Sequence, residues 1–173
     1  MKYTYSFLAS LALAASAFAG TEVVSKDYKA PAPVPCFADT EFQLDVFGNY
    51  TWETEGHNGD GFGGGLGLNY FFHRNFGIGV SGSLRDGDHS AIWNADLDLI
   101  VRFPIEGGIC IAPYILAGGG IETNGTTIGT WNAGGGLEWR ATPSIGIYGE
   151  GRYTWGASDE DNAQARVGLR FVF

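Results

Sequence analysis

The chain has 173 residues, which is enough for one domain and a leader segment. It carries 10 Lys and Arg against 19 Asp and Glu, and a chain with this net charge of −9 is a poor binder of nucleic acid. Its mean hydropathy of −0.02, its 28 glycines and its aromatic share of 14% favour a small β-barrel over a helical domain.

Residues 1–19 have the features of a secretory signal peptide. Lys2 precedes an apolar stretch over residues 7–18, and Ala17-Phe18-Ala19 supplies the small residues of a cleavage site. The apolar stretch is shorter than the about 20 residues that a helix needs to cross a bilayer. We therefore expect cleavage after Ala19. No Cys follows the expected cut directly, so a lipoprotein anchor is not expected.

Residues 20–40 form a polar linker, with proline alternating with other residues over 30–35. Alternating proline favours the extended polyproline II conformation. We interpret this segment as a periplasmic lead-in to the folded domain, 41–173. The alternative, a proline motif that binds a partner, has only composition to support it.

From residue 41 onward, apolar and polar residues alternate in eight segments. In the first segment, Phe42 and Val46 share one face, while Gln43 and Asp45 share the other. This period of two indicates β-strands with one apolar and one polar face. The expected strands cover residues 41–52, 61–72, 76–85, 90–103, 109–122, 128–140, 145–154 and 163–173.

The fifth segment, 109–122, admits two registers, because its Gly and Ala residues mark neither face clearly. We assign Ile115 and Ile121 to the apolar face and Tyr114 and Glu122 to the polar face. The polar face of 61–72 is largely glycine, which would leave room inside a narrow barrel for long side chains from opposite strands.

The connections between the strands fall into two sets, because an even number of strands places both termini on one side. The turns near 73–75, 104–108 and 141–144 lie on that side. The loops near 53–60, 86–89, 123–127 and 155–162 lie on the other side. These distal loops contain no Lys or Arg but many acids, namely Glu53, Glu55, Asp60, Asp86, Asp88, Asp159, Glu160 and Asp161.

The last segment, 163–173, places a polar residue, then glycine, then two aromatic residues near its end. These residues are Arg166, Gly168, Phe171 and the final Phe173. This pattern resembles the C-terminal signal of outer-membrane β-barrels. The resemblance implies that the barrel assembly machinery reads this strand and that the strand closes a barrel against the first one.

Over residues 41–173 the chain resembles the small eight-stranded OmpA/OmpX-like outer-membrane barrels. The resemblance implies an all-β fold, an eight-stranded antiparallel transmembrane up-and-down β-barrel, surrounded by outer-membrane lipid and with both termini in the periplasm. The periplasmic domain that follows the barrel in OmpA is not expected. The alternative is a soluble β-sandwich or a lipocalin-like barrel, whose polar faces should carry many Lys and Glu, yet Lys is absent after residue 29.

The polar faces of the expected strands carry acids and arginines in equal number. Isolated buried charges are strongly unfavourable, whereas paired ones persist. We therefore expect a lumen charge network that plugs the barrel, because side chains fill a barrel of eight strands. The alternative is an ion path whose selectivity the charges set. The expected network comprises Asp45, Arg85, Asp96, Asp98, Arg102, Glu122, Glu138, Arg140, Glu150, Arg152, Arg166 and Arg170.

The two cysteines, Cys36 and Cys110, both belong to the periplasmic side of the expected barrel. That compartment is oxidising, so we expect a disulfide that ties the lead-in to the barrel rim. Two separate thiols are the alternative, because a sequence does not give the separation of the Cα atoms. No His lies nearby, and no metal site is expected at these cysteines.

The acidic distal loops have two interpretations. Asp86-Gly87-Asp88 and residues 159–162 offer the oxygen ligands that calcium prefers, but neither has the spacing of an EF-hand. We favour solvated loops, which would also be the surface that meets a macromolecule outside the cell.

One grouping suggests hydrolysis. His89 and Ser90 adjoin Asp86 and Asp88, and His57 lies on another loop. A serine nucleophile needs a histidine within hydrogen-bond distance and a carboxylate that orients it, and no spacing here supports such a triad. We expect no enzyme activity and no cofactor.

The sequence therefore predicts an outer-membrane barrel with a structural or surface-interaction role, a plugged lumen and acidic extracellular loops. Two alternatives remain, a narrow porin-like channel for ions or small solutes and a lipid-modifying hydrolase at the rim.

Overall fold

The computed structural model describes residues 35–54, 60–87, 91–105, 107–157 and 161–173. These residues belong to one compact unit, Val34–Phe173. The expected signal peptide, 1–19, and most of the expected lead-in, 20–40, lie outside the described residues. No helix long and apolar enough to cross a membrane occurs in the described part of the chain.

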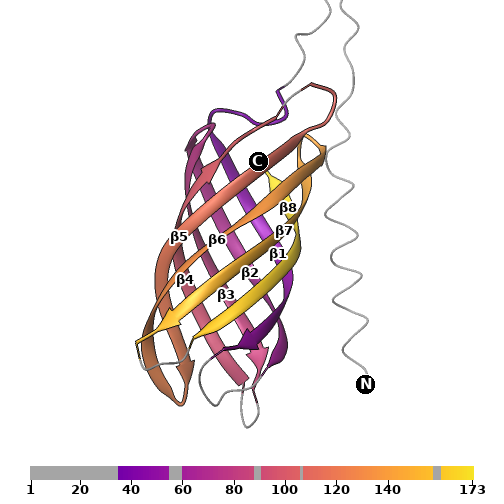
Figure 1. Ribbon diagram of the computed structural model, residues 1–173. Helices are drawn as coiled ribbons and strands as arrows, with labels where there is room; N and C mark the ends of the chain where they lie inside the picture. The colour runs from indigo at the N-terminus through magenta and orange to yellow at the C-terminus, as the bar shows by residue number, and fades with distance from the viewer. Residues whose placement is uncertain (1–34, 55–59, 88–90, 106, 158–160) are drawn as a thin grey trace, which may run out of the picture. The chain divides into compact units, whose positions relative to one another are not determined.

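Eight antiparallel strands close into a barrel, which confirms the expected fold (Figure 1). Each strand pairs with the next, and β8 pairs with β1, so that every strand has a neighbour on both sides. Each strand has at least 11 residues, enough for a tilted strand to cross the apolar core of a bilayer. The strands are β1 (Glu41–Glu53), β2 (Gly61–His73), β3 (Phe76–Asp86), β4 (Ala91–Arg102), β5 (Ile111–Asn124), β6 (Thr126–Thr142), β7 (Ile145–Gly156) and β8 (Asn162–Val172).

Large apolar side chains cover the outside of all eight strands, and charged side chains fill the inside. On β4, Leu97 and Leu99 are 61% and 66% exposed, whereas Asp96 and Asp98 are buried. A soluble sandwich or a lipocalin-like barrel would instead bury its apolar face. The observed arrangement is that of a transmembrane barrel, in which lipid contacts the outer face.

Exposed aromatic side chains lie near both ends of the strands. We call the end with Glu41 and Phe173 the terminal rim, and the opposite end the loop rim. Near the loop rim lie Trp52, Phe62, Trp93, Trp131 and Trp155. Near the terminal rim lie Phe42, Phe72, Phe76, Phe103, Trp139 and Phe173. Such girdles are typical of the two boundaries between membrane and water.

The expected register of the fifth strand is confirmed, because Tyr114 and Glu122 are buried and Ile115 and Ile121 are exposed. The expected loop at 123–127 was wrong. β5 continues to Asn124 and β6 begins at Thr126, so that the chain reverses at Gly125, whose φ is +76°. Glycine adopts this left-handed conformation without strain, and the flanking threonines favour extended backbone.

Candidate functional site

Buried charged side chains line the lumen of the described barrel. Six arginines and seven acids on the strands point inward and are shielded from solvent. Twelve of these are the residues expected from the sequence, and the thirteenth, Glu41, was not expected. Their ion pairs form three groups between the terminal rim and the loop rim.

The terminal group is centred on Glu41, at the start of β1. Its Oε2 accepts hydrogen bonds from Arg102 Nη1 and Arg140 Nη2, each at 2.8 Å, and from Gln43 Nε2 at 2.9 Å. One carboxylate on β1 therefore joins cations on β4 and β6 across the barrel.

Arg170 on β8 extends the terminal group by joining Glu138 on β6 to Asp45 on β1. Its Nη1 donates to Glu138 Oε2 at 2.7 Å, and its Nε and Nη2 donate to the two oxygens of Asp45 at 2.7 and 2.6 Å. Asn69 Nδ2 donates to the same Asp45 carboxylate at 2.8 Å. Arg140 also pairs with Glu138 through its Nε.

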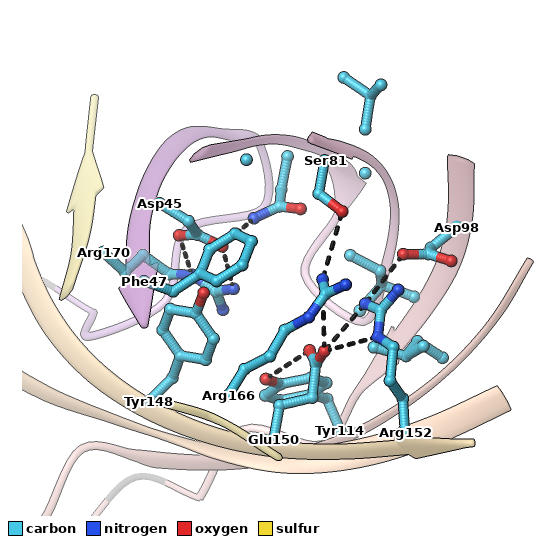
Figure 2. Close-up of a pocket in the computed structure, with 16 residues that line it drawn as sticks. Asp45, Phe47, Ser81, Asp98, Tyr114, Tyr148, Glu150, Arg152, Arg166 and Arg170 are labelled. Atoms are coloured by element: carbon cyan, nitrogen blue, oxygen red, sulfur yellow. Dashed lines mark hydrogen bonds and ion pairs between the residues drawn. The ribbon is translucent and has the colours of Figure 1, made fainter. Parts of the chain in front are cut away.

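The central group contains two arginines, Arg152 and Arg166, among three acids, of which Figure 2 shows Asp98 and Glu150. Arg152 lies 2.8 Å from Glu150, 3.1 Å from Asp98 and 3.3 Å from Asp96. Arg166 pairs with Asp96 at 3.2 Å and lies 3.9 Å from Glu150. Each cation is thus shared between carboxylates on different strands.

Aromatic rings pack against the inward cations. The guanidinium carbon of Arg166 lies 4.8 Å from the centre of the Phe47 ring, and that of Arg170 lies 4.6 Å from the Tyr148 ring. These distances are in the range of cation–π contacts, which are stronger where water is excluded.

Inward glycines provide the space for these rings. A Cβ built on Gly65 would lie 2.6 Å from Phe47 Cζ, and one on Gly136 would lie 2.6 Å from Tyr114 Cζ. A real side chain could not occupy either position without moving a ring. The inward glycines therefore adjoin the aromatic side chains that fill the lumen.

The third group lies toward the loop rim. Arg85 Nη2 on β3 pairs with Glu122 Oε1 on β5 at 2.9 Å, across β4. Asn94 Nδ2 on β4 donates to the other oxygen of Glu122 at 2.7 Å.

A small cavity remains between the terminal and central groups. Its volume is about 20 Å³, and Asp45, Tyr114, Tyr148, Arg166 and Arg170 are among the residues that line it. A buried water needs about 10–15 Å³ of such space, so this cavity holds roughly one water molecule. The close-up in Figure 2 shows the charged and aromatic side chains converging around it.

The expected disulfide between Cys36 and Cys110 is present, with the two Cα atoms 5.7 Å apart. It joins the segment before β1 to the connection before β5, at the terminal rim.

The residues of the expected assembly signal lie on both faces of β8 and at its end. Arg166 is buried in the lumen, and Gly168 shares its face, whereas Phe173 is 76% exposed on the outside. Phe173 also exchanges two backbone hydrogen bonds with Phe42 on β1, at 2.9 and 3.3 Å. The pairing of the first and last strands therefore extends to the final residue.

Of the grouping weighed for the hydrolase alternative, His57, Asp88, His89 and Ser90 lie outside the described residues, and Asp86 is exposed at the end of β3. Among the residues that the structure describes, no group of three His, Cys, Asp or Glu side chains could hold a metal ion.

Of residues 159–162, for which calcium binding was the alternative to a solvated loop, Asp161 and Asn162 are described. The Asp161 carboxylate accepts hydrogen bonds from Gly156 N and Tyr153 Oη, both at 3.2 Å. This carboxylate is therefore engaged within the β7–β8 hairpin.

Comparison with known proteins identifies similar structures but no similar sequence. No protein-family model matches the chain, and no curated protein matches it. The N-terminal β-barrel domain of Pseudomonas aeruginosa OprF matches with a TM-score of 0.64 and 19% identity, over 77% of this chain and 97% of that one. Neisserial surface protein A matches with a TM-score of 0.61 and 14% identity, over 79% and 98%. Ail, the attachment invasion locus protein of Yersinia pestis, matches with a TM-score of 0.56 and 16% identity, over 79% and 100%.

At these levels of identity the likeness concerns the fold. The chain has the fold of the small eight-stranded outer-membrane β-barrels, as the pattern of its strands implied.

Proposed function

We propose that the chain is an outer-membrane barrel with a structural or surface-contact role, whose own ion pairs close its lumen. The observation that carries this proposal is the buried charge network. Its terminal and central groups join side chains across the lumen, its third group joins β3 to β5, and the cavity between the first two has room for roughly one water molecule.

The outer surface supports the membrane location. It is apolar on all eight strands and carries aromatic side chains near both rims. In this proposal residues 1–19 direct export, the barrel assembly machinery engages β8, outer-membrane lipid surrounds the strands, and both termini lie in the periplasm. Cys36 and Cys110 would then lie in an oxidising compartment, which suits their disulfide.

The ion pairs oppose a permanent pore. A water-filled path would have to separate Arg152 from its three carboxylates or Glu41 from its two arginines. Removing one partner of a buried ion pair costs about 3–5 kcal/mol, because the other charge is left without compensation. A narrow channel for ions or small solutes is the alternative, and it requires a rearrangement of these pairs.

The loop rim is the proposed contact surface. Asp60 and Asp86 are exposed there, and the remaining loops contribute further acids and no Lys or Arg. One structure of Ail holds the heparin analogue sucrose octasulfate, a polyanion. The acidic loops of this chain would repel such a ligand, so we infer a partner with a cationic surface.

Osmotic swelling of vesicles tests the closed lumen. The mature chain, 20–173, is refolded into vesicles, and insertion is verified by protection of the strands from protease. We expect no swelling in isosmotic solutions of small sugars or salts. Swelling that depends on the inserted protein would overturn the proposal of a closed lumen and favour the channel alternative. Separately, recovery of the protein in the inner membrane or the soluble fraction of cells would contradict the outer-membrane location.

A further inference from the structure

The segment Pro35–Thr40, just before β1, packs into the terminal rim of the barrel. Phe37 is 1% exposed, although it belongs to no strand. The centre of its ring lies 4.8 Å from the guanidinium carbons of both Arg102 and Arg140. An aromatic side chain from outside the barrel wall thus covers the two cations of the terminal group.

Hydrogen bonds hold the backbone of this segment to the same group. Ala38 N donates to Glu41 Oε1 at 2.6 Å, and Arg140 Nη1 donates to the carbonyl oxygen of Cys36 at 3.4 Å. The segment therefore shields the Glu41 carboxylate and both of its arginine partners from the solvent at this rim.

The disulfide fixes the far end of the segment. Cys36 is bonded to Cys110, and the carbonyl oxygen of Cys110 accepts a hydrogen bond of 2.8 Å from Arg140 N on β6. The near end continues directly into β1 at Glu41. Phe37 is thus attached to the barrel wall on both sides, and its ring is held over the lumen at a high effective concentration.

We propose that residues 35–40 form a redox-latched plug of the terminal rim. With the disulfide intact, the plug stays docked. A dithiol reductant can reach the disulfide, because both cysteines are partly exposed. A thiolate of the reductant attacks one sulfur, the Cys36–Cys110 bond breaks, and two cysteine thiols form while the reductant becomes a disulfide.

After reduction, the segment is joined covalently to the barrel only through β1, and its hydrogen bonds and ring contacts alone keep it docked. Phe37 then exchanges between a docked and an undocked position, and the undocked position exposes Glu41, Arg102 and Arg140 at the rim. The central ion pairs around Arg152 lie deeper and involve no residue of the segment. The latch therefore controls access to the terminal group and leaves the rest of the lumen closed.

A fluorine label tests this proposal without altering the disulfide. The full mature chain is produced with 4-fluorophenylalanine at position 37 and, as a matched control, at position 47, which is also buried but lies inside β1. The ¹⁹F signal of each protein in micelles is recorded with a water-soluble gadolinium chelate, before and after reduction by dithiothreitol.

In the oxidised protein we expect both labels to be protected from the chelate. After reduction, the signal of residue 37 should broaden by at least several-fold, and that of residue 47 should not change. Equal protection of residue 37 in both states would overturn the proposal. Broadening at both positions would also overturn it, because it would mean that the whole barrel loosens. A double variant, Cys36→Ser with Cys110→Ser, should reproduce the reduced state without a reductant.

Discussion

Arg170 on β8 donates hydrogen bonds to both carboxylate oxygens of Asp45 on β1, from Nε at 2.7 Å and from Nη2 at 2.6 Å. The two residues lie directly opposite each other in the register of these strands, and both are buried. The first and last strands of the barrel are therefore joined from inside by a bidentate ion pair, in addition to their backbone hydrogen bonds.

Removing the cation of this pair should weaken the closure of the barrel. In Arg170→Met, Asp45 keeps only neutral hydrogen-bond partners such as Asn69, and the free energy of unfolding should fall by about 3–5 kcal/mol. The combined variant Asp45→Asn with Arg170→Met leaves no such uncompensated charge, so its loss should be smaller than the sum of the single losses. Urea unfolding in lipid vesicles, arranged as a double-mutant cycle, measures the difference. Strictly additive losses would mean that the pair contributes no coupling.

Two glycines on neighbouring strands should respond differently to the same change. A Cβ on inward Gly136 would lie 2.4 Å from the carbonyl oxygen of Gly149 and 2.6 Å from the Tyr114 ring, whereas a Cβ on outward Gly149 meets nothing within 4 Å. Gly136→Ala should therefore destabilise the barrel by about 1–3 kcal/mol. Gly149→Ala should be neutral or stabilise it by up to about 1 kcal/mol, because alanine loses less backbone entropy on folding.

The two variants are compared by the midpoint and slope of their urea unfolding curves in the same lipid vesicles. Equal effects of the two substitutions would show that lumen packing does not determine where glycine is needed.

Glu41 should be essential to the terminal group. In Glu41→Gln, Arg102 and Arg140 lose their shared carboxylate at a site where Glu41 is only 3% exposed, and we expect a loss of about 3–5 kcal/mol in the free energy of unfolding. The matched control is Asp39→Asn, an exposed acid two residues earlier, which should change stability by no more than about 0.5 kcal/mol. Similar losses in both variants would indicate a general effect of charge on this segment.

Much of the fold followed from alternation of residue types, because the face of a strand changes at every residue. Asp96 and Asp98 alternate with Leu97 and Leu99, and this alone places the acids inside and the leucines outside. The same rule placed Tyr114 inside, although the glycines and alanines of its strand were compatible with either register.

The parts of the lumen that sequence analysis missed were those where residue type and position disagree. Phe47 is apolar yet points inward, because glycines on neighbouring strands make room for its ring. Glu41 has the same parity as Asp45 and could have been assigned on that ground, but it stands at the edge of a strand. Phe37 lies outside any periodic segment, so its insertion into the rim depends on tertiary contacts that no local pattern contains.

Which acid pairs with which arginine could not be predicted from the sequence either. Equal numbers of acids and arginines predict that pairs form, but not which ones. Arg85 pairs with Glu122 across an intervening strand, and Arg152 shares three acids, because the curvature of a closed barrel brings these side chains together.

Single-channel conductance in a planar bilayer tests the closed lumen most directly. The refolded chain 20–173 is compared with Arg102→Ala and Arg152→Ala, which each remove one cation from a different group of the network, and insertion of all three proteins is verified independently. The account predicts no conducting openings from the inserted wild type and none from either variant, because the remaining side chains still fill the lumen. Reproducible openings in the wild type, with an ion preference that changes in the arginine variants, would contradict it and would make the charge network a selectivity filter.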